Sequence, residues 1–126
     1  MPTKRILLVD DEEDIRQVVK LSLQLVGGWD VVTAGSGSEG VAAALARLPD
    51  VILLDVMMPD LDGPATLRRL QSQPATRDIP VILLTAKAQA ADRRRFAELG
   101  VAGVITKPFD PMELPGQVAE TLGWQR

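Results

Sequence analysis

Residues 51–63 read VILLDVMMPDLDG. The segment opens with four Val, Ile and Leu residues and shows no alternation with polar residues. A strand of this kind is covered on both faces, which is typical of a parallel sheet packed between helices. Asp55 follows the apolar run directly, and Gly63 with Pro64 marks the start of a helix. The segment therefore predicts a buried strand that ends in a carboxylate.

Apolar runs on either side of this segment predict four more strands. They cover residues 6–9, 31–34, 81–84 and 101–105, the last with a weaker pattern. Helical patterns separate the strands at residues 14–26, 38–48, 63–70, 88–99 and 110–122. Because strands alternate with helices and such crossovers are right-handed, we expect an α/β fold. Its core is a doubly wound, five-stranded parallel sheet with helices on both faces.

The last predicted helix contains a local conflict. Asp110, Pro111 and Glu113 suit its N-cap, N1 and N3 positions, which is the pattern of a capping box with proline at the first site. Pro115 then falls inside the helix, where proline removes a hydrogen bond and clashes with the preceding turn. We therefore expect either a kink at Pro115 or a helix that starts late.

Length and composition narrow the function. A chain of 126 residues predicts one domain that spans residues 1–126. The absence of His and Cys excludes serine–histidine triads, thiol nucleophiles, zinc sites with the usual ligands and disulfides. The net charge of −3 argues against direct binding to nucleic acid or to an anionic membrane. No run approaches the roughly 18 apolar residues of a membrane helix, so we expect a cytoplasmic protein.

Polar side chains follow most of the predicted strands. Asp10 and Asp11 follow the first strand, Asp55 the third, Thr85 the fourth and Lys107 the fifth. In a doubly wound sheet the ligand crevice lies beyond the carboxyl ends of the strands. Three carboxylates gathered there repel one another unless a hard divalent cation lies between them, and Mg²⁺ prefers phosphate oxygens as further ligands. The pattern predicts a Mg²⁺ site that receives a phosphoryl group, with a lysine and a hydroxyl to neutralise and orient it.

Four segments resemble the receiver domains of bacterial two-component response regulators. They are ILLVDDEEDIR (residues 6–16), VILLDVMMPDLDG (51–63), VILLTA (81–86) and TKPF (106–109). The resemblance covers essentially the whole chain. The separations of 44, 30 and 22 residues between Asp11, Asp55, Thr85 and Lys107 are also like those of the family. The resemblance implies the flavodoxin-like strand order 2-1-3-4-5.

The same resemblance implies a role for each acidic residue of the predicted site. Asp55 resembles the phosphoacceptor, the nucleophile that forms an aspartyl phosphate. Asp11 resembles a direct Mg²⁺ ligand, and Asp10 resembles a ligand that acts mainly through water. Asp55 and the backbone carbonyl of Met57 complete the expected protein ligands. The implied function is a signal-transduction switch that promotes its own phosphorylation and dephosphorylation on Asp55.

The remaining family positions are matched with one departure. Thr85 resembles the hydroxyl that moves onto the phosphoryl oxygens, and Lys107 the cation that pairs with them, followed by Pro108 in a cis peptide. The family often carries an aromatic residue three positions before the lysine, where this chain has Val104. Because the chain has no His, the resemblance implies a phosphohistidine donor on a sensor histidine kinase or a histidine phosphotransfer protein. It also implies a downstream protein partner whose identity the sequence does not give.

Three other interpretations compete with a receiver domain. Gly35, Gly37 and Gly40 form a G-x-G-x-x-G pattern between a strand and a helix, with Asp55 twenty residues beyond Gly35, which is typical of dinucleotide-binding sheets. The second half of such a sheet is missing, so ordinary turn glycines explain the pattern better. A small phosphatase with Asp10 as nucleophile is a second interpretation. An interaction module that has lost phosphorylation is a third.

Overall fold

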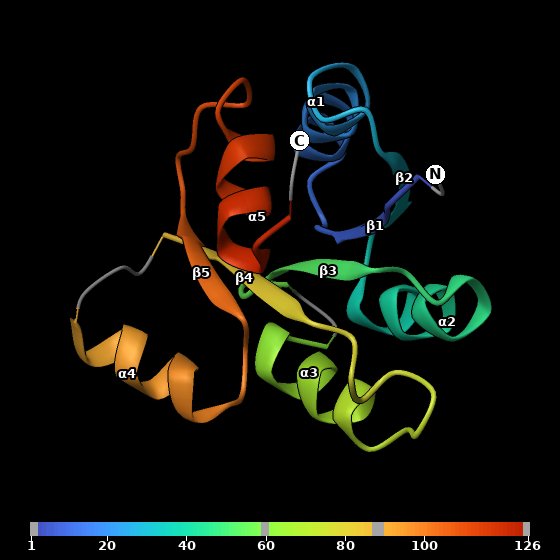
Figure 1. Cartoon of the computed structure of the whole chain (residues 1–126). Coiled ribbons are helices and arrows are strands. Elements are labelled where there is room, and N and C mark those ends of the chain that lie inside the picture. Colours follow the sequence, from blue (N-terminus) through green and yellow to red (C-terminus); the bar gives the residue numbers. More distant parts are fainter. Residues whose placement is uncertain (1–2, 59–60, 87–89, 125–126) are drawn as a thin grey trace.

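The computed structural model describes residues 3–58, 61–86 and 90–124 (Figure 1). Within these residues, one sheet of five parallel strands has the order β2-β1-β3-β4-β5. The strands are β1 Arg5–Val9, β2 Asp30–Ala34, β3 Val51–Asp55, β4 Val81–Thr85 and β5 Gly103–Thr106. The predicted parallel sheet and the order implied by the resemblance are confirmed.

The helices lie on both faces of the sheet, as predicted. They are α1 Glu13–Leu25, α2 Gly37–Arg47, α3 Gly63–Gln71, α4 Ala90–Glu98 and α5 Leu114–Leu122. Figure 1 shows α1 and α5 against one face and α2, α3 and α4 against the other. The predicted start of α4 at residue 88 lies outside the described residues.

Each central strand contributes to two apolar cores. In β1, Ile6 and Leu8 pack toward the α1 and α5 side, while Leu7 and Val9 pack toward the other helices. All four side chains are at most 1% exposed. Because successive strand residues point to opposite faces, both faces demand apolar residues. This explains the uniform apolar runs of the sequence.

The helix α5 starts late, which was one of the two expected outcomes. It begins at Leu114 with Pro115 in its first turn, where the missing N–H of proline has no helical partner to lose. The predicted capping box is wrong, because Glu113 occupies the N-cap position and makes no side-chain cap bond. Asp110 instead caps a separate turn, where its Oδ1 accepts a 2.9 Å hydrogen bond from the Met112 amide.

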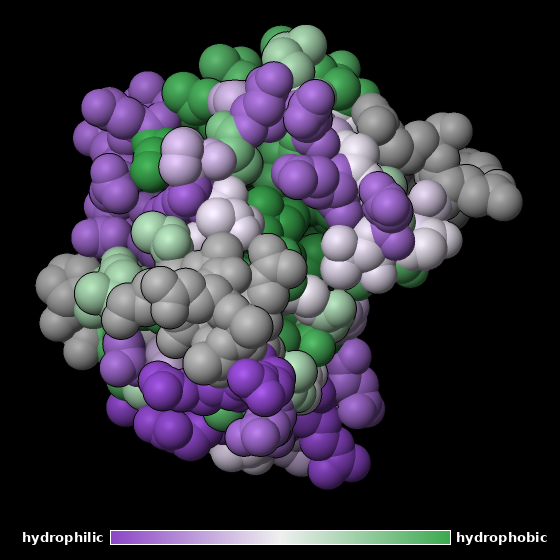
Figure 2. Space-filling view, turned by 90° about the vertical axis from the view of Figure 1, so that its left-hand side faces the viewer, coloured by the Kyte–Doolittle hydropathy of each residue, from purple (hydrophilic) through white to green (hydrophobic). Residues whose placement is uncertain are grey.

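The β5 edge of the sheet is only half covered. Gly103, Val104 and Thr106 are half-buried there, and only Ile105 of β5 is buried. The strand begins two residues later than predicted, because Ala102 hydrogen-bonds to Val81 as part of the preceding loop. Figure 2 shows this side of the molecule, with apolar residues visible at mid-height above a strongly hydrophilic lower part, the level of α4.

Within the described ranges, no helix combines the length and the apolar character that crossing a bilayer requires. The cytoplasmic location stays a prediction.

Candidate functional site

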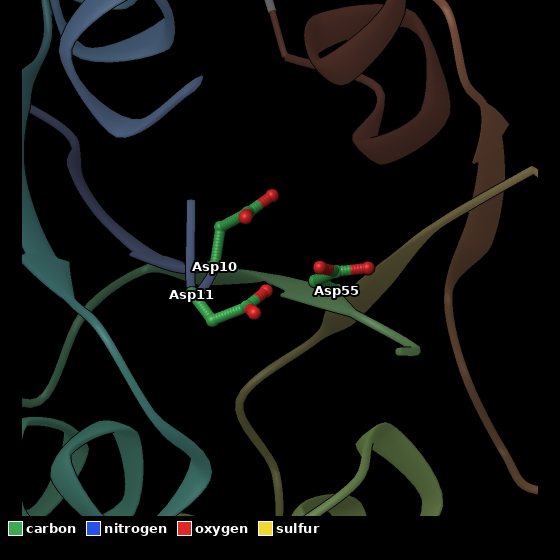
Figure 3. A group of neighbouring side chains, drawn as sticks. All are labelled: Asp10, Asp11 and Asp55. Carbon is green, nitrogen blue, oxygen red and sulfur yellow. The ribbon is translucent and has the colours of Figure 1, made fainter. Parts of the chain in front are cut away.

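The predicted acidic residues meet at the carboxyl ends of β1 and β3. These strands are neighbours in register, with Val9 opposite Leu54, so the residues that follow them emerge side by side. Figure 3 shows the carboxylates of Asp10, Asp11 and Asp55 turned toward one space. One oxygen from each lies within 4.8 Å of the others. The sheet topology therefore gathers three carboxylates that are far apart in the sequence.

The Lys107 ammonium joins two of these carboxylates. Its Nζ lies 3.0 Å from Asp10 Oδ2 and 3.4 Å from Asp55 Oδ2. The side chain of Asp10 is fully buried and that of Asp55 is 5% exposed, whereas that of Lys107 is 18% exposed. Removal of the Lys107 ammonium would leave the two carboxylates without a cation in a place that water solvates poorly. Removal of the carboxylates would likewise leave the ammonium without an anion.

Burial and charge shift the titration of this pair. Desolvation, followed by the nearby charge of Asp10, raises the pKa of Asp55, and the attraction of Lys107 only partly offsets this. Burial also favours the neutral amine of Lys107. The hydrogen bond to Asp10 and the charges of both carboxylates outweigh that penalty and raise the pKa of Lys107. The site is therefore short of positive charge, which favours the binding of a cation.

Local backbone structure orients the carboxylates. Asp10 Oδ1 accepts a 2.9 Å hydrogen bond from the Glu12 amide, and Asp55 Oδ1 accepts a 3.2 Å hydrogen bond from the Met57 amide. Gly63, at the start of α3, packs directly on the loop after β3. A Cβ on Gly63 would lie 2.7 Å from the Cα of Val56 and 3.0 Å from the Asp55 carbonyl oxygen. A larger residue at Gly63 would therefore displace the backbone that carries Asp55.

The hydroxyl and the lysine come from the adjacent strands β4 and β5. Thr85 ends β4 and is 1% exposed. The Lys107 amide donates a 2.8 Å hydrogen bond to the Thr85 carbonyl, which ties the two positions together. The peptide between Lys107 and Pro108 is cis, as the resemblance implied. Thr85 and Lys107 thus lie at the same edge of the sheet as the acidic residues.

The three carboxylates fit a magnesium ion. Oxygens bound to one Mg²⁺ in octahedral geometry lie about 3 Å apart in neighbouring positions, so the oxygens of Asp10, Asp11 and Asp55, which lie within 4.8 Å of one another, need to approach by at most about 2 Å. Hard carboxylate oxygens are the protein ligands that this ion prefers. The role of the Met57 carbonyl stays a prediction.

The fold agrees with the comparisons to known proteins. The family model for the response regulator receiver domain matches residues 6–119. The chain belongs to this family. A receiver domain is the phosphoacceptor switch of a response regulator.

Solved receiver domains share the fold closely. The chemotaxis protein CheY4 of Vibrio cholerae superposes with a TM-score of 0.88 at 31% identity, covering 95% of this chain and 99% of that protein. The receiver domain of the sensor histidine kinase PA1611 from Pseudomonas aeruginosa superposes with a TM-score of 0.84 at 31% identity. That superposition covers 97% of this chain and 99% of the other. The PA1611 structure contains a magnesium ion coordinated in its active site cleft.

Curated relatives are longer proteins. The alkaline phosphatase synthesis transcriptional regulatory protein PhoP of Bacillus subtilis is 40% identical over 94% of this chain and 48% of its own length. The phosphate regulon regulator PhoB of Pseudomonas aeruginosa is 38% identical over 97% of this chain and 53% of its own length. The receiver domain described here thus spans about half the length of these relatives.

The glycine pattern of this receiver domain has a structural explanation. Ser36 Oγ accepts a 3.1 Å hydrogen bond from the Glu39 amide, and Glu39 Oε2 accepts a 3.0 Å hydrogen bond from the Gly35 amide. The helix α2 is therefore capped by its own side chains. Gly37 packs against α3, where a Cβ would lie 2.3 Å from Thr66 Oγ1. The dinucleotide-binding interpretation is excluded, because the pattern serves helix capping and close helix packing.

An apolar groove opens beside the site. Its volume is about 390 Å³, and it lies between α1 and the segment after β5. Its lining is mostly apolar and includes Ile15, Val18, Val19, Ala86, Pro108, Phe109 and Pro111. Lys107 lies in the wall of this groove, so the groove and the acidic site of the receiver domain adjoin. Val18 on its rim is 48% exposed although it is apolar.

Sequence reasoning missed one residue at this edge. Arg16, on α1, hydrogen-bonds to the backbone carbonyl of Asp10. A lone Arg in the first turns of an amphipathic helix gives no signal that separates this contact from an ordinary solvated side chain.

Proposed function

We propose that residues 1–126 form a single receiver domain that accepts a phosphoryl group on Asp55 in a Mg²⁺-dependent reaction. The observation that carries this proposal is the placement of Asp55. Its carboxylate lies at the end of β3, nearly buried, beside the carboxylates of Asp10 and Asp11 and 3.4 Å from the ammonium of Lys107. A site of this composition gives a carboxylate nucleophile both a cation site and a partner for the incoming anion.

The phosphoryl transfer uses groups that lie at this edge of the sheet. One Asp55 oxygen attacks the phosphorus of a phosphohistidine, so that a P–O bond forms while the P–N bond breaks. The electron pair of the broken bond stays on the imidazole nitrogen of the donor. Lys107 then pairs with the phosphoryl oxygens, and the Thr85 hydroxyl donates a hydrogen bond to them. Water hydrolyses the resulting acyl phosphate at the same place and returns free Asp55.

Asp10, Asp11, Asp55 and the Met57 carbonyl would hold the magnesium ion. When bound, the ion neutralises the charge that builds up between the carboxylates and the phosphoryl group. The 3.0 Å pair of Asp10 with Lys107 supports a role for Asp10 mainly through water, whereas the exposed carboxylate of Asp11 is placed to bind the ion directly.

The donor is a protein that carries a phosphohistidine, either a sensor histidine kinase or a histidine phosphotransfer protein. The chain itself contains no His. The apolar groove beside Lys107 supports a protein donor, because a docked partner with an apolar surface would hold its imidazole next to Asp55. Exposed apolar residues that line such a groove commonly mark a protein interaction site.

Phosphorylation would shift the domain between two surface states that a downstream protein distinguishes. Aromatic switching is absent at residue 104, where Val104 packs half-buried against the core next to Leu83 of β4. A β-branched side chain there reports movement of Thr85 through packing, with a smaller change of surface than a ring would give. That this chain contacts no nucleic acid directly stays a prediction.

Intact mass after incubation with acetyl phosphate and Mg²⁺ tests the proposal. We expect a gain of one phosphoryl group that chelation of Mg²⁺ prevents. Asp55→Asn should remove the gain completely. Asp62→Asn is the matched control, because Asp62 is an exposed carboxylate of the same loop that only caps α3, and this variant should be phosphorylated like the wild type.

No mass gain in the wild type, with the fold confirmed by circular dichroism, would favour an interaction module that has lost phosphorylation. A mass gain that persists in Asp55→Asn but disappears in Asp10→Asn would instead favour the phosphatase-like chemistry. Capture of partners with and without beryllofluoride then identifies the proteins that distinguish the two states.

A further inference from the structure

A guanidinium from α1 holds the loop that carries two of the expected metal ligands. Arg16 Nη1 donates a 2.7 Å hydrogen bond to the backbone carbonyl of Asp10. This carbonyl lies six residues earlier in the chain and before α1 begins, so the side chain reaches back past the start of its own helix. It belongs to the peptide group between Asp10 and Asp11. Because a peptide group is planar, fixing its carbonyl also fixes the direction of the Asp11 N–H and the position of the Asp11 Cα.

The peptide group that precedes Asp10 is also held in place. The Asp10 amide donates a 3.1 Å hydrogen bond to the Ala34 carbonyl at the end of β2. The backbone on both sides of the Asp10 Cα is therefore fixed, one side by β2 and the other by Arg16. The Asp10 side chain is bound separately by Lys107 and by the Glu12 amide. Asp11 itself is exposed, and the Arg16 bond holds the peptide group that leads into it.

Gly35 makes room for this contact. A Cβ on Gly35 would lie 3.2 Å from Arg16 Nη1, 3.5 Å from its Cζ and 3.7 Å from its Nη2. The guanidinium thus packs directly against the place that a Cβ of residue 35 would occupy. Gly35 is not among the glycines with positive φ, so its backbone conformation is open to other residues. Space for the guanidinium, rather than backbone freedom, is what the glycine provides.

We propose that Arg16, seated on Gly35, is a positioning residue that orients the Asp10–Asp11 peptide for Mg²⁺ binding. This inference rests on the proposed function, because it concerns the same metal site. Outer residues that orient metal ligands commonly change metal affinity by about 10- to 100-fold when they are replaced. Arg16 acts through one peptide group, so we expect an effect of about tenfold, at the lower end of that range.

An electrostatic role and a positioning role for Arg16 predict opposite changes in Mg²⁺ affinity when this residue is replaced. A positive charge near the carboxylates disfavours a second cation, so a purely electrostatic role means that removing Arg16 strengthens Mg²⁺ binding. A positioning role means that removing it weakens binding. Lys20 offers a matched comparison, because it lies one turn further along α1, is exposed and lines the same surface hollow as Arg16.

Calorimetric titration of the full chain with MgCl₂ separates the two roles. We expect Arg16→Met, which keeps a long apolar side chain without the donor, to bind Mg²⁺ about tenfold more weakly than the wild type. Lys20→Met, which loses the same charge, should bind as tightly as the wild type or slightly more tightly. Urea unfolding without Mg²⁺ shows whether each variant is folded.

A second series disturbs the same contact without touching the arginine. Gly35→Ala should weaken Mg²⁺ binding slightly, because Arg16 needs to move by only a few tenths of an ångström. Gly35→Val should weaken it further, because its branched side chain occupies the place of the guanidinium. Both variants keep the Gly35 amide that donates to Glu39, so the capping of α2 is retained.

The outcomes separate this inference from the proposed function. An Arg16→Met variant that binds Mg²⁺ as tightly as the wild type, or more tightly, overturns the positioning role and leaves the proposed function intact. If Arg16→Met does not fold, unchanged affinity in Gly35→Val overturns it instead. Absence of Mg²⁺ binding by the wild type contradicts the proposed function itself.

Discussion

The two ends of the sheet are stabilised in different ways. At the amino ends of the strands, Trp29 is only 9% exposed, and its ring meets that of Trp124 edge to face, with centroids 5.4 Å apart. At the carboxyl ends, the buried groups are charged: Asp10 is fully buried, Asp55 is 4% exposed, and both contact Lys107. One end of the sheet buries aromatic surface and the other buries charge.

This difference separates stability from function. Burial of apolar surface stabilises a fold directly, whereas buried ion pairs gain little over the cost of removing charges from water. The carboxyl end is therefore expected to be the less stable part. A bound cation and a phosphoryl group would balance its buried charges. If this contrast is correct, substitutions at the amino end change stability alone. Substitutions at the carboxyl end change stability in a way that depends on Mg²⁺ and pH.

The largest effect is expected for Trp29→Ala. Loss of a buried aromatic ring should lower the free energy of unfolding by about 4 kcal/mol. Mg²⁺ affinity of the folded fraction should not change, because Trp29 lies at the opposite end of the sheet from the carboxylates. Urea unfolding and calorimetric titration measure the two quantities. The matched control is Leu25→Ala at the end of α1, where an apolar residue is already 79% exposed. A parallel loss of Mg²⁺ affinity in Trp29→Ala would show that the two ends are coupled.

A somewhat smaller effect is expected for Lys107→Met. Without Mg²⁺, this variant leaves the buried carboxylates of Asp10 and Asp55 unpaired, which should lower the free energy of unfolding by about 3 kcal/mol. Saturating Mg²⁺ should recover most of this loss, because the ion binds only the folded site and replaces the missing positive charge. Urea unfolding with and without MgCl₂ measures the recovery. A loss that Mg²⁺ does not reduce would mean that Lys107 acts through packing.

The contrast also explains which features the sequence could predict. The strands were predictable because both faces of β1, β3 and β4 require apolar residues, and this leaves an unbroken run. The gathering of Asp10, Asp55, Thr85 and Lys107 followed from the topology, since parallel strands place their carboxyl ends at one edge. The start of the last helix was not predictable, because two pairs of residues each suit a helix start and local rules do not choose between them. The pairs are Asp110 with Pro111 and Glu113 with Pro115. The structure uses the second start.

Contacts that depend on three-dimensional fit left no pattern in the sequence. The Arg16 bond to the Asp10 carbonyl needs the exact turn before α1 and the open space over Gly35. The packing of Gly63 on the backbone of Val56 likewise becomes visible only when α3 is placed against β3. Spacing along the chain predicts which side chains share an edge, but it does not predict which backbone groups they hold.

Asp55→Asn should increase stability at neutral pH without Mg²⁺. The folded state raises the pKa of Asp55 above its ordinary value of 3.8, so the folded protein holds this proton more tightly than the unfolded chain. The contribution of Asp55 to stability is therefore greatest below pH 3.8 and is lost as the pH rises through the folded-state pKa. Asparagine does not titrate, so the variant does not undergo this loss of stability. The advantage of the variant should be present at neutral pH and vanish toward acid pH.

Urea unfolding of the wild type and Asp55→Asn across this pH range measures the difference. Asp62→Asn is again the control, since it makes the same change at an exposed carboxylate. A variant that is less stable than the wild type at neutral pH would mean that the pair with Lys107 outweighs desolvation at Asp55.

The smallest effect is expected for Lys4→Met, which makes at the amino end the same change as Lys107→Met at the carboxyl end. Lys4 is exposed, and its Nζ lies 5.0 Å from the centroid of the Trp124 ring. An exposed cation–π contact contributes about 0.5 kcal/mol, and the loss should be the same with and without Mg²⁺. Urea unfolding of both lysine variants, with and without MgCl₂, therefore compares one substitution in two environments. If Mg²⁺ also changed the loss of unfolding free energy caused by Lys4→Met, the ion would stabilise the whole fold. The carboxyl end would then not be a separate region whose stability depends on its buried charges.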